Sequence, residues 1–233
     1  MKMVPLNKNE HAAYKIRTPE NMDFAAGAHF ARLVLAEFVQ ACSVFPIIFV
    51  ENADIGGFDP GVMLGFEPGQ NFFVDGEGKW LVPFVPASIR QYPFSYSYFE
   101  GQPDKWVLLF DEDSGLLNIG AGEPLFDEEG RESTTLNNIM QFMGELQAAA
   151  AATTEFSAYL ADKSLIVPLD IKVPGENCPH SLQGIYGVNG QRLNELPDDV
   201  FLELKNKGYL AVIYAHLISL GQIERLVALS PKV

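Results

Sequence analysis

The order of the apolar segments constrains the fold of this chain more than any other feature. Short runs rich in β-branched and aromatic residues follow one another between glycines and prolines, without strict alternation with helix-like segments. Strands that come in runs favour an antiparallel or mixed sheet with helices packed beside it. The predicted strands cover residues 47–50, 61–66, 71–74, 79–85, 106–110, 165–171 and 184–188. Pro168 favours an edge position for the strand that contains it.

Helices are predicted where apolar residues recur at helical spacing. One covers residues 23–42, and an Ala-rich helix begins at Ser133 and runs to about residue 160. Pro197 begins a third helix, which Gly208 caps, and a fourth follows over 209–229. The predicted fold class is α+β: a largely antiparallel mixed sheet with several hairpins, packed against an N-terminal helix, a central Ala-rich helix and two C-terminal helices.

Three segments carry similar turn chemistry. Residues 75–79 and 125–131 both contain an acid, a glycine three positions later and then a basic residue, and 187–192 is a looser case. Glycine supplies the positive φ that tight hairpin turns need, so three hairpins are predicted. No fixed period links the three segments, which favours convergent turn chemistry over a true internal repeat.

Composition excludes several classes of protein. Hydrophobic residues make up 48% of the 233 residues and charged ones 20%, with 17 Phe and 8 Tyr, which excludes an acidic disordered chain. No Ser-rich or Pro-rich linker interrupts the sequence, so a single domain over 1–233 is predicted. The net charge of −14 argues against nucleic-acid binding, which needs clustered Lys and Arg.

The acidity is concentrated in one part of the chain. Residues 111–170 carry 12 of the 30 acidic side chains and 2 of the 16 basic ones, a net charge of −10. The spacing does not fit a calcium loop: a loop starting at Asp111 has Gly115 and Gly122 where ligands are needed, and one starting at Asp127 has Gly130 too early. A solvated acidic loop region, densest over 111–132, is the favoured interpretation.

The common catalytic motifs do not occur in the sequence. It contains no phosphate-binding loop, no dinucleotide fingerprint, no nucleophile elbow and no pair of His at ligand spacing. We therefore predict no metal and no cofactor. The two cysteines are Cys42 and Cys178. Cys178 lies near His180, but a loop turn held by Pro179 is favoured over a nucleophile site.

Two polar candidates stand in apolar surroundings. His29 and Glu37 lie close to one face of the first predicted helix, where a structural pair is favoured over acid–base chemistry. Arg90 lies in an aromatic segment and needs an anion. A structural partner such as Asp111 is favoured, and a bound ligand is the alternative.

The N-terminal segment has no apolar stretch of the secretory type, so the default compartment is the cytoplasm, with export without a cleaved signal left open. Residues 208–223 are uncharged but shorter than the roughly 20 residues of a membrane-spanning helix. A buried core helix is expected there, and no membrane span.

The combination of short motifs resembles the SapC family over residues 4–226. The residues that carry the resemblance are 37–38, 45–49, 64–66, 71–73, 78–80, 85–86, 89–94, 111–113, 122–127, 184–186 and 192–193. The pattern of Trp80, Arg90-x-x-Pro93-Phe94 and Gly-Glu-Pro-Leu-Phe is the most specific part.

The resemblance implies a context rather than a reaction. The family takes its name from a gene associated with a bacterial surface-layer protein, and its members look like neighbours of halogenase-like flavoproteins and outer-membrane receptor genes. It carries over no catalytic residues. The matching polar residues are candidates for a shared site or determinants of the fold: Glu37, Asn71, Trp80, Arg90, Asp111 and Glu123.

Two functions follow as hypotheses. The first is a non-enzymatic accessory protein of a bacterial surface-layer or outer-membrane nutrient-uptake system, which binds a basic protein partner through the acidic region that includes Glu128, Glu129 and Glu132. The alternative is an enzyme of unrecognised class acting on a carboxylate-bearing small molecule or peptide. Arg90 would then hold the substrate and Glu37 or Asp111 would be the general base.

Overall fold

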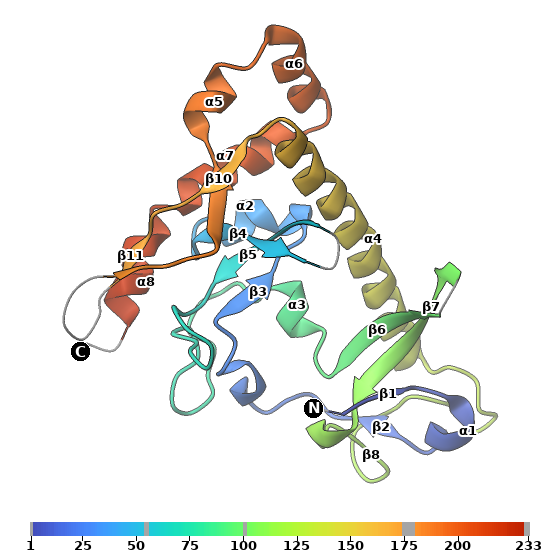
Figure 1. The fold of residues 1–233 in the computed structure, drawn as a ribbon. Helices are drawn as coiled ribbons and strands as arrows, with labels where there is room; N and C mark the ends of the chain where they lie inside the picture. Colours follow the sequence, from blue (N-terminus) through green and yellow to red (C-terminus); the bar gives the residue numbers. More distant parts are fainter. Residues whose placement is uncertain (1, 54–55, 100–101, 174–179, 231–233) are drawn as a thin grey trace. The chain divides into compact units, whose positions relative to one another are not determined.

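The computed structural model describes residues 2–53, 56–99, 102–173 and 180–230 (Figure 1). The chain forms two compact units, each from two segments: the first unit from Met1–Asn21 and Ser88–Ala148, the second from Met22–Ala87 and Ala149–Val233. Both units contain helices and antiparallel strands, so the predicted α+β class is confirmed. A single domain over 1–233 stays a prediction.

The first unit is built on two small antiparallel sheets. One has the order β1-β7-β6, with Met3 opposite Asp111 and Phe94 opposite Phe110. The other has the order β8-β2-β9. The elements are β1 (Met3–Pro5), α1 (Lys8–His11), β2 (Lys15–Ile16), β6 (Phe94–Phe99), β7 (Gln102–Asp111), η3 (Glu112–Ser114), β8 (Leu117–Asn118) and β9 (Glu123–Pro124). The short α3 (Ala87–Arg90) leads into this unit.

Alternation along β7 forms the core of the first unit. Leu108 and Phe110 point to one face of the strand and are buried. They cluster with Phe94 of β6 and with Leu136 and Met143 of α4. The predicted strand over 106–110 is therefore confirmed, because its two-residue period matches a half-buried strand.

The long helix α4 (Thr134–Asp162) belongs to both units in turn and confirms the predicted Ala-rich helix. Its first part buries Leu136 and Met143 in the first unit. Its last part buries Phe156 and Leu160 in the second. The alanines between them favour helix without adding bulk.

The second unit contains a sheet of order β10-β13-β4-β5-β3, antiparallel throughout. Pro168 lies in the edge strand β10, as predicted. The elements are η1 (Asp23–Ala25), β3 (Phe30–Arg32), η2 (Leu35–Glu37), α2 (Phe38–Ala41), β4 (Ile47–Asn52), β5 (Gly57–Met63), β10 (Ile166–Pro168), β11 (Lys172–Val173), β12 (His180–Ser181), β13 (Ile185–Val188), α5 (Gly190–Asn194), α6 (Asp198–Asn206), α7 (Tyr209–Ser219) and α8 (Gln222–Leu229).

Aromatic contacts hold the core of the second unit. Phe156 of α4 meets Phe38 of α2 and Tyr209 of α7 edge to face, with ring centroids 6.2 and 4.9 Å apart. Phe45 meets Phe73 edge to face at 4.6 Å. Such contacts add to the apolar area that each ring buries. The core therefore joins the helices to the strand face through rings, and the buried His216 is among them, 5.3 Å from the Phe49 ring.

The predicted helix over 23–42 is wrong. The structure has η1, β3, η2 and α2 in its place, because Phe30–Arg32 pairs with β5 as an edge strand. Gly61 of β5 makes room for this pairing: a Cβ there would lie 2.3 Å from the Phe30 ring. His29 and Glu37 therefore do not share a helix face. Tertiary pairing overrides the helical period here.

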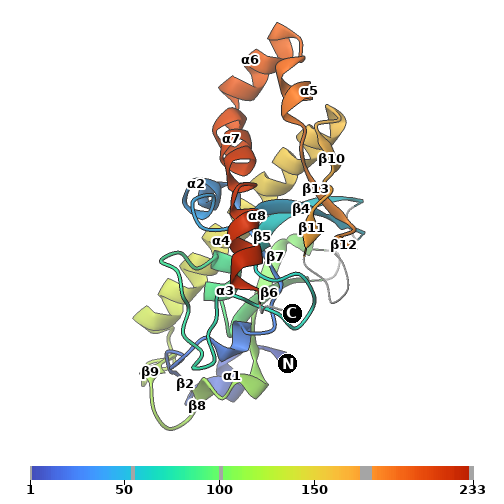
Figure 2. The same ribbon diagram turned by 90° about the vertical axis from the view of Figure 1, so that its left-hand side faces the viewer.

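Three smaller predictions are also corrected. Residues 71–74 and 79–85 pair through the single bridge Val74–Trp80, and Pro83 removes one N–H donor from the second segment. Asn189 caps α5 instead of opening a third hairpin: its side chain accepts from two helix N–H groups. The helix predicted over 209–229 is interrupted after Ser219, and Figure 2 shows α8 following α7.

Within the described ranges, no single helix is long and apolar enough to cross a membrane. Of the described helices, α7 and α8 reach that length and composition only when taken together, and they are bent by 41°.

Candidate functional site

Glu37 is held by main-chain groups of the second unit. Its side chain is 7% exposed. One carboxylate oxygen accepts from the N–H of Ala87 at 2.7 Å and the other from the N–H of Val34 at 3.2 Å. A carboxylate with both oxygens engaged in this way ties two segments together. The geometry therefore gives Glu37 a structural role in joining η2 to the start of α3.

Asn71 and Trp80 have similar roles. The Asn71 side chain is buried, donates to the carbonyl of Ala25 and accepts from the N–H of Phe73, both at 2.9 Å. The indole N–H of Trp80 donates to the carbonyl of Phe84 at 2.9 Å. These bonds satisfy polar groups of irregular backbone that no strand or helix would satisfy. Both residues thus act as determinants of the fold.

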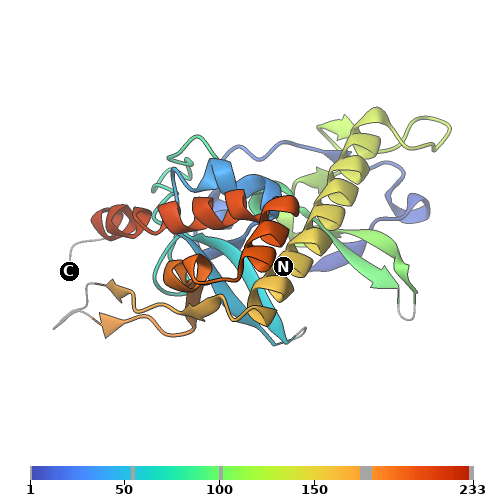
Figure 3. The ribbon, with the colours of Figure 1, turned by 90° about the horizontal axis from the view of Figure 1, so that it is seen from above.

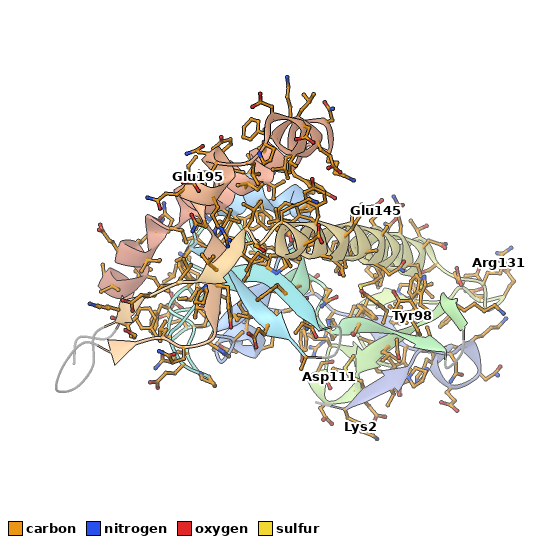
Figure 4. The ribbon with its side chains drawn as sticks, turned by 45° about the horizontal axis from the view of Figure 1, so that its top comes forward. Lys2, Tyr98, Asp111, Arg131, Glu145 and Glu195 are labelled. Atoms are coloured by element: carbon orange, nitrogen blue, oxygen red, sulfur yellow. The ribbon has the colours of Figure 1, made fainter. Side chains whose placement is uncertain are left out.

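Asp111 is buried in the first unit, at 4% exposure. One oxygen accepts from the main-chain N–H of Lys2 at 2.8 Å and of Asp113 at 3.2 Å. The other accepts from the hydroxyl of Tyr92 at 3.2 Å. Figure 4 shows Lys2 and Asp111 close together. The carboxylate joins the N-terminal strand, the end of β7 and the segment before β6.

Tyr92 is a residue that the sequence analysis missed. Burial and the neighbouring Asp111 carboxylate raise the pKa of its hydroxyl, so it stays protonated and donates to Asp111. No spacing rule finds this pair, because the two residues are 19 positions apart and meet only through the β6–β7 pairing. The sequence feature that could have pointed to Tyr92 is its position in the segment 89–94, which also contains the candidate Arg90.

Arg90 is exposed, unlike the buried cation that its sequence surroundings predict. Its guanidinium carbon lies 5.4 Å from the centre of the Phe142 ring on α4. A guanidinium over an aromatic face is favourable while its outer edge stays in water. The hydrogen bonds of Asp111 described above go to Lys2, Tyr92 and Asp113. The predicted ion pair between Arg90 and Asp111 stays a prediction.

Two turns, one in each unit, have the same hydrogen-bond network. In both, one Asp oxygen accepts from the N–H groups two and four positions later, at 3.0 and 2.9 Å for Asp75 and at 3.0 and 2.8 Å for Asp127. Gly78 and Gly130 follow at φ 76° and 71°. Single bridges flank the turns, Val74–Trp80 and Phe126–Glu132. The two more similar predicted turns are therefore confirmed.

The second of these turns carries the acidic candidates. Glu128, Glu129 and Glu132 are exposed, and we call residues 127–132 the acidic turn. Arg131 pairs with Asp127 at 2.7 Å and also with Glu129, and Figure 4 shows it at the edge of the first unit. Hydrogen bonds from Arg131 lower the pKa of the Asp127 carboxyl. The backbone of the turn is thus fixed, the carboxylates of Glu128 and Glu132 face water, and the exposed carboxylate of Glu129 pairs with Arg131.

Glu123 is also exposed, in β9 opposite Ile16 of β2. Glu123 lies four residues before the acidic turn, and its main chain pairs with β2. Among the described residues, no group of three His, Cys, Asp or Glu side chains is arranged to hold a metal ion. The hypothesis about Cys178 and its neighbours lies outside the described residues.

A family model named SapC matches residues 6–226, nearly the whole chain. The chain belongs to the SapC family. No match was found among curated proteins or among solved structures.

Family membership gives the motif residues a common interpretation. In this SapC protein, Glu37, Asn71 and Asp111 are buried and bonded to main-chain groups, and Trp80 is half-buried with its indole N–H bonded. The exposed motif residues are Arg90 and Glu123. In this chain the buried ones tie irregular segments in place, and a shared site among the motif residues stays a prediction.

Proposed function

We propose that this SapC protein is a non-enzymatic accessory protein of a bacterial surface-layer or outer-membrane nutrient-uptake system, and that it binds a basic protein partner through the acidic turn. The family membership supports the context. The observation that carries the proposal is the exposure of Glu128, Glu129 and Glu132 on a turn whose backbone is held by Asp127.

A fixed turn favours binding for a physical reason. Association orders loops and side chains, and that ordering weakens affinity unless the loop is already ordered in the free protein. Here Asp127 accepts two main-chain hydrogen bonds, and the stem of Lys8 lies under Gly130, where a Cβ would be 2.5 Å from it. The carboxylates are therefore presented without a large ordering cost.

Charge supports a basic partner. The segment 111–170 has a net charge of −10, and unlike charges speed the encounter of two proteins and align them. Exposed charges attract over about 10 Å at 0.1 M salt, so the interaction should weaken as salt rises. The alternative enzyme function stays a prediction: two of its proposed groups, Glu37 and Asp111, have their carboxylate oxygens bonded to groups of the protein.

The test compares two sets of charge reversals in the full chain. The test variant carries Glu128→Lys, Glu129→Lys and Glu132→Lys. The control carries Glu67→Lys, Glu77→Lys and Glu195→Lys, which are exposed in the second unit and change the net charge equally. A partner is first isolated from the native bacterium with the wild-type chain at low salt, and its recovery is then measured for each variant.

The affinity should fall by at least about threefold for the test variant and stay near wild type for the control, since each of three exposed ion pairs contributes roughly 0.2–1 kcal/mol. Equal recovery by the two variants would show that the acidic turn does not hold the partner.

A further inference from the structure

The strands β4 and β13 of the second unit stop pairing at one end, and α7 takes the place of the strand partner there. The two strands pair over residues 49–50 and 185–186 and no further. In the same register, Ile47 would lie opposite Val188. Instead, α7 packs against both strands, and Figure 3 shows it in orange-red beside the sheet.

Two side chains of α7 accept the main-chain N–H groups that have no strand partner at this end. Nε2 of His216 accepts from the N–H of Val188, and the hydroxyl of Ser219 accepts from the N–H of Ile47, both at 2.9 Å. The Ser219 hydroxyl in turn donates to the carbonyl of His216 at 2.6 Å. These bonds satisfy buried backbone donors, so the end of β13 depends on a polar side chain of α7.

The ring of His216 is enclosed by the second unit. It is fully buried, its centre lies 5.3 Å from that of the Phe49 ring, and a Cβ at Gly187 would be 3.0 Å from Nε2. Because Nε2 accepts a hydrogen bond, the neutral ring carries its proton on Nδ1. Nδ1 has no hydrogen-bond partner among the described residues. Such a buried polar atom is rare in native proteins and requires an explanation.

The elements around α7 offer the ring no charged partner. In their described sequences, α2, α7 and β13 contain no Asp, Glu, Lys or Arg, and Glu51 of β4 bonds to the hydroxyl of Tyr186. The charged side chains of α6 and of the last part of α4 are exposed to water: Asp198, Asp199, Glu203, Lys205, Glu155 and Asp162. Burial therefore lowers the pKa of His216, and the nearby main chain of Ile47 opposes this only in part.

We infer that His216 is an acid-sensitive switch: the neutral ring holds Val188 against α7, and its protonation releases the end of β13 before the second unit unfolds. A proton on Nε2 turns the acceptor into a donor that faces the Val188 N–H, so the hydrogen bond is lost and an unpaired charge is left in the core. Asn189 follows Val188 and caps α5, so the start of α5 is released with it. This inference stands independently of the proposed partner of the acidic turn.

Hydrogen exchange of the full chain, followed by NMR, measures this release. The protection factor of the Val188 N–H, corrected for the intrinsic pH dependence of exchange, is compared at about pH 7.5 and about pH 5. It should fall about thirtyfold, because the released ring binds a proton with its ordinary pKa of 6.5 and the held ring with a pKa of about 4. Val188 should also be less protected than Phe156 of α4 at both pH values, since release does not require unfolding of the unit.

His216→Gln and His29→Gln are the matched variants. Glutamine keeps an acceptor and does not titrate, so the protection of Val188 in His216→Gln should not depend on pH. His29 is an exposed histidine of the same unit, so His29→Gln should behave as the wild type does. Circular dichroism shows whether His216→Gln is folded.

The inference is overturned if the protection of Val188 is the same at both pH values, or if it falls equally in folded His216→Gln. It is also overturned if Val188 and Phe156 are equally protected in the wild type, because the ring is then released only when the whole unit unfolds. The comparison of Val188 with Phe156 needs no variant, so it decides the matter even if His216→Gln does not fold.

Discussion

At the scale of single residues, buried polar side chains of this protein hold main-chain groups in place. Glu37 and Asp111 accept main-chain hydrogen bonds, and Asn71 both donates and accepts them. His216 is fully buried, and its Nε2 accepts from the N–H of Val188 at 2.9 Å. A ring nitrogen that accepts carries no proton, so this bond requires neutral histidine.

Protonation of His216 should make the protein less stable in mild acid. Burial lowers the pKa of His216 to about 4, against 6.5 when it is unfolded. Between these values the unfolded chain binds more protons than the folded one, so stability falls as the pH falls from about 6.5 to about 4. The shift corresponds to about 3 kcal/mol. Urea unfolding at several pH values measures it.

His216→Gln is the comparison, because glutamine keeps an acceptor and does not titrate. The difference in unfolding free energy between the wild type and this variant should shrink or reverse towards pH 4. A difference that stays constant with pH would contradict the assigned protonation of His216.

At the scale of elements, the two turns that begin at Asp75 and Asp127 show that hydrogen bonds between near neighbours in sequence can form the same structure in different surroundings. The turns at Asp75 and Asp127 lie in different units, yet they share hydrogen bonds, a glycine of positive φ and flanking bridges. By contrast, the apolar period over 23–42 does not produce one helix, because β3 pairs with β5. Turns depend on neighbours in sequence, whereas strand pairing depends on a partner elsewhere.

Replacing the turn glycines should test this local control. Gly78→Ala places a Cβ on a residue with φ 76°, and Gly130→Ala places one on a residue with φ 71°. Each substitution should lower the unfolding free energy by roughly 1–2 kcal/mol. The Cβ at position 130 would also approach the Lys8 Cε to 2.5 Å, but this is the far end of an exposed, flexible side chain that can move away, so the positive φ is the main cost. Thermal melting measures both. Gly76→Ala is the control, since its Cβ meets nothing within 4 Å. Equal stability of all three variants would contradict the prediction.

At the scale of the whole molecule, α4 is the element common to the two units. A helix that buries one stretch of its length in each unit connects their stabilities, because unfolding either unit exposes part of it. The single domain predicted from the sequence therefore implies that the two units unfold together in one cooperative transition. It is testable, since the chain has 2 Trp, with Trp106 in the first unit and Trp80 in the second.

Single-tryptophan variants should unfold in one transition. In Trp80→Phe the fluorescence reports on Trp106, and in Trp106→Phe it reports on Trp80. If the chain is one cooperative domain, the fluorescence midpoint in urea should coincide with the far-ultraviolet circular dichroism midpoint in each variant. Separate midpoints would show that the two units unfold independently.

The sequence by itself determined the local features of this protein. Residues such as Pro168, Asp127 and Gly130, together with the alanines of α4, act on their own backbone or on neighbours a few positions away, so the edge strand, the turn and the long helix were predictable. The α+β class and the SapC resemblance came from the order of such features, and the family match confirms the resemblance.

Only the tertiary structure decided the roles of the polar candidates. Glu37 was predicted to lie on a helix, and Asp111 to pair with a cation or act as a base. Each accepts hydrogen bonds from residues such as Ala87 and Lys2, 50 and 109 positions away, while the pairing of Asp111 with Arg90 and its role as a base stay predictions. The exposed apolar side chains of α2 and α7 were likewise hidden in runs that read as core. The physical reason is that burial and partners are set by contacts between distant segments, which no local period contains.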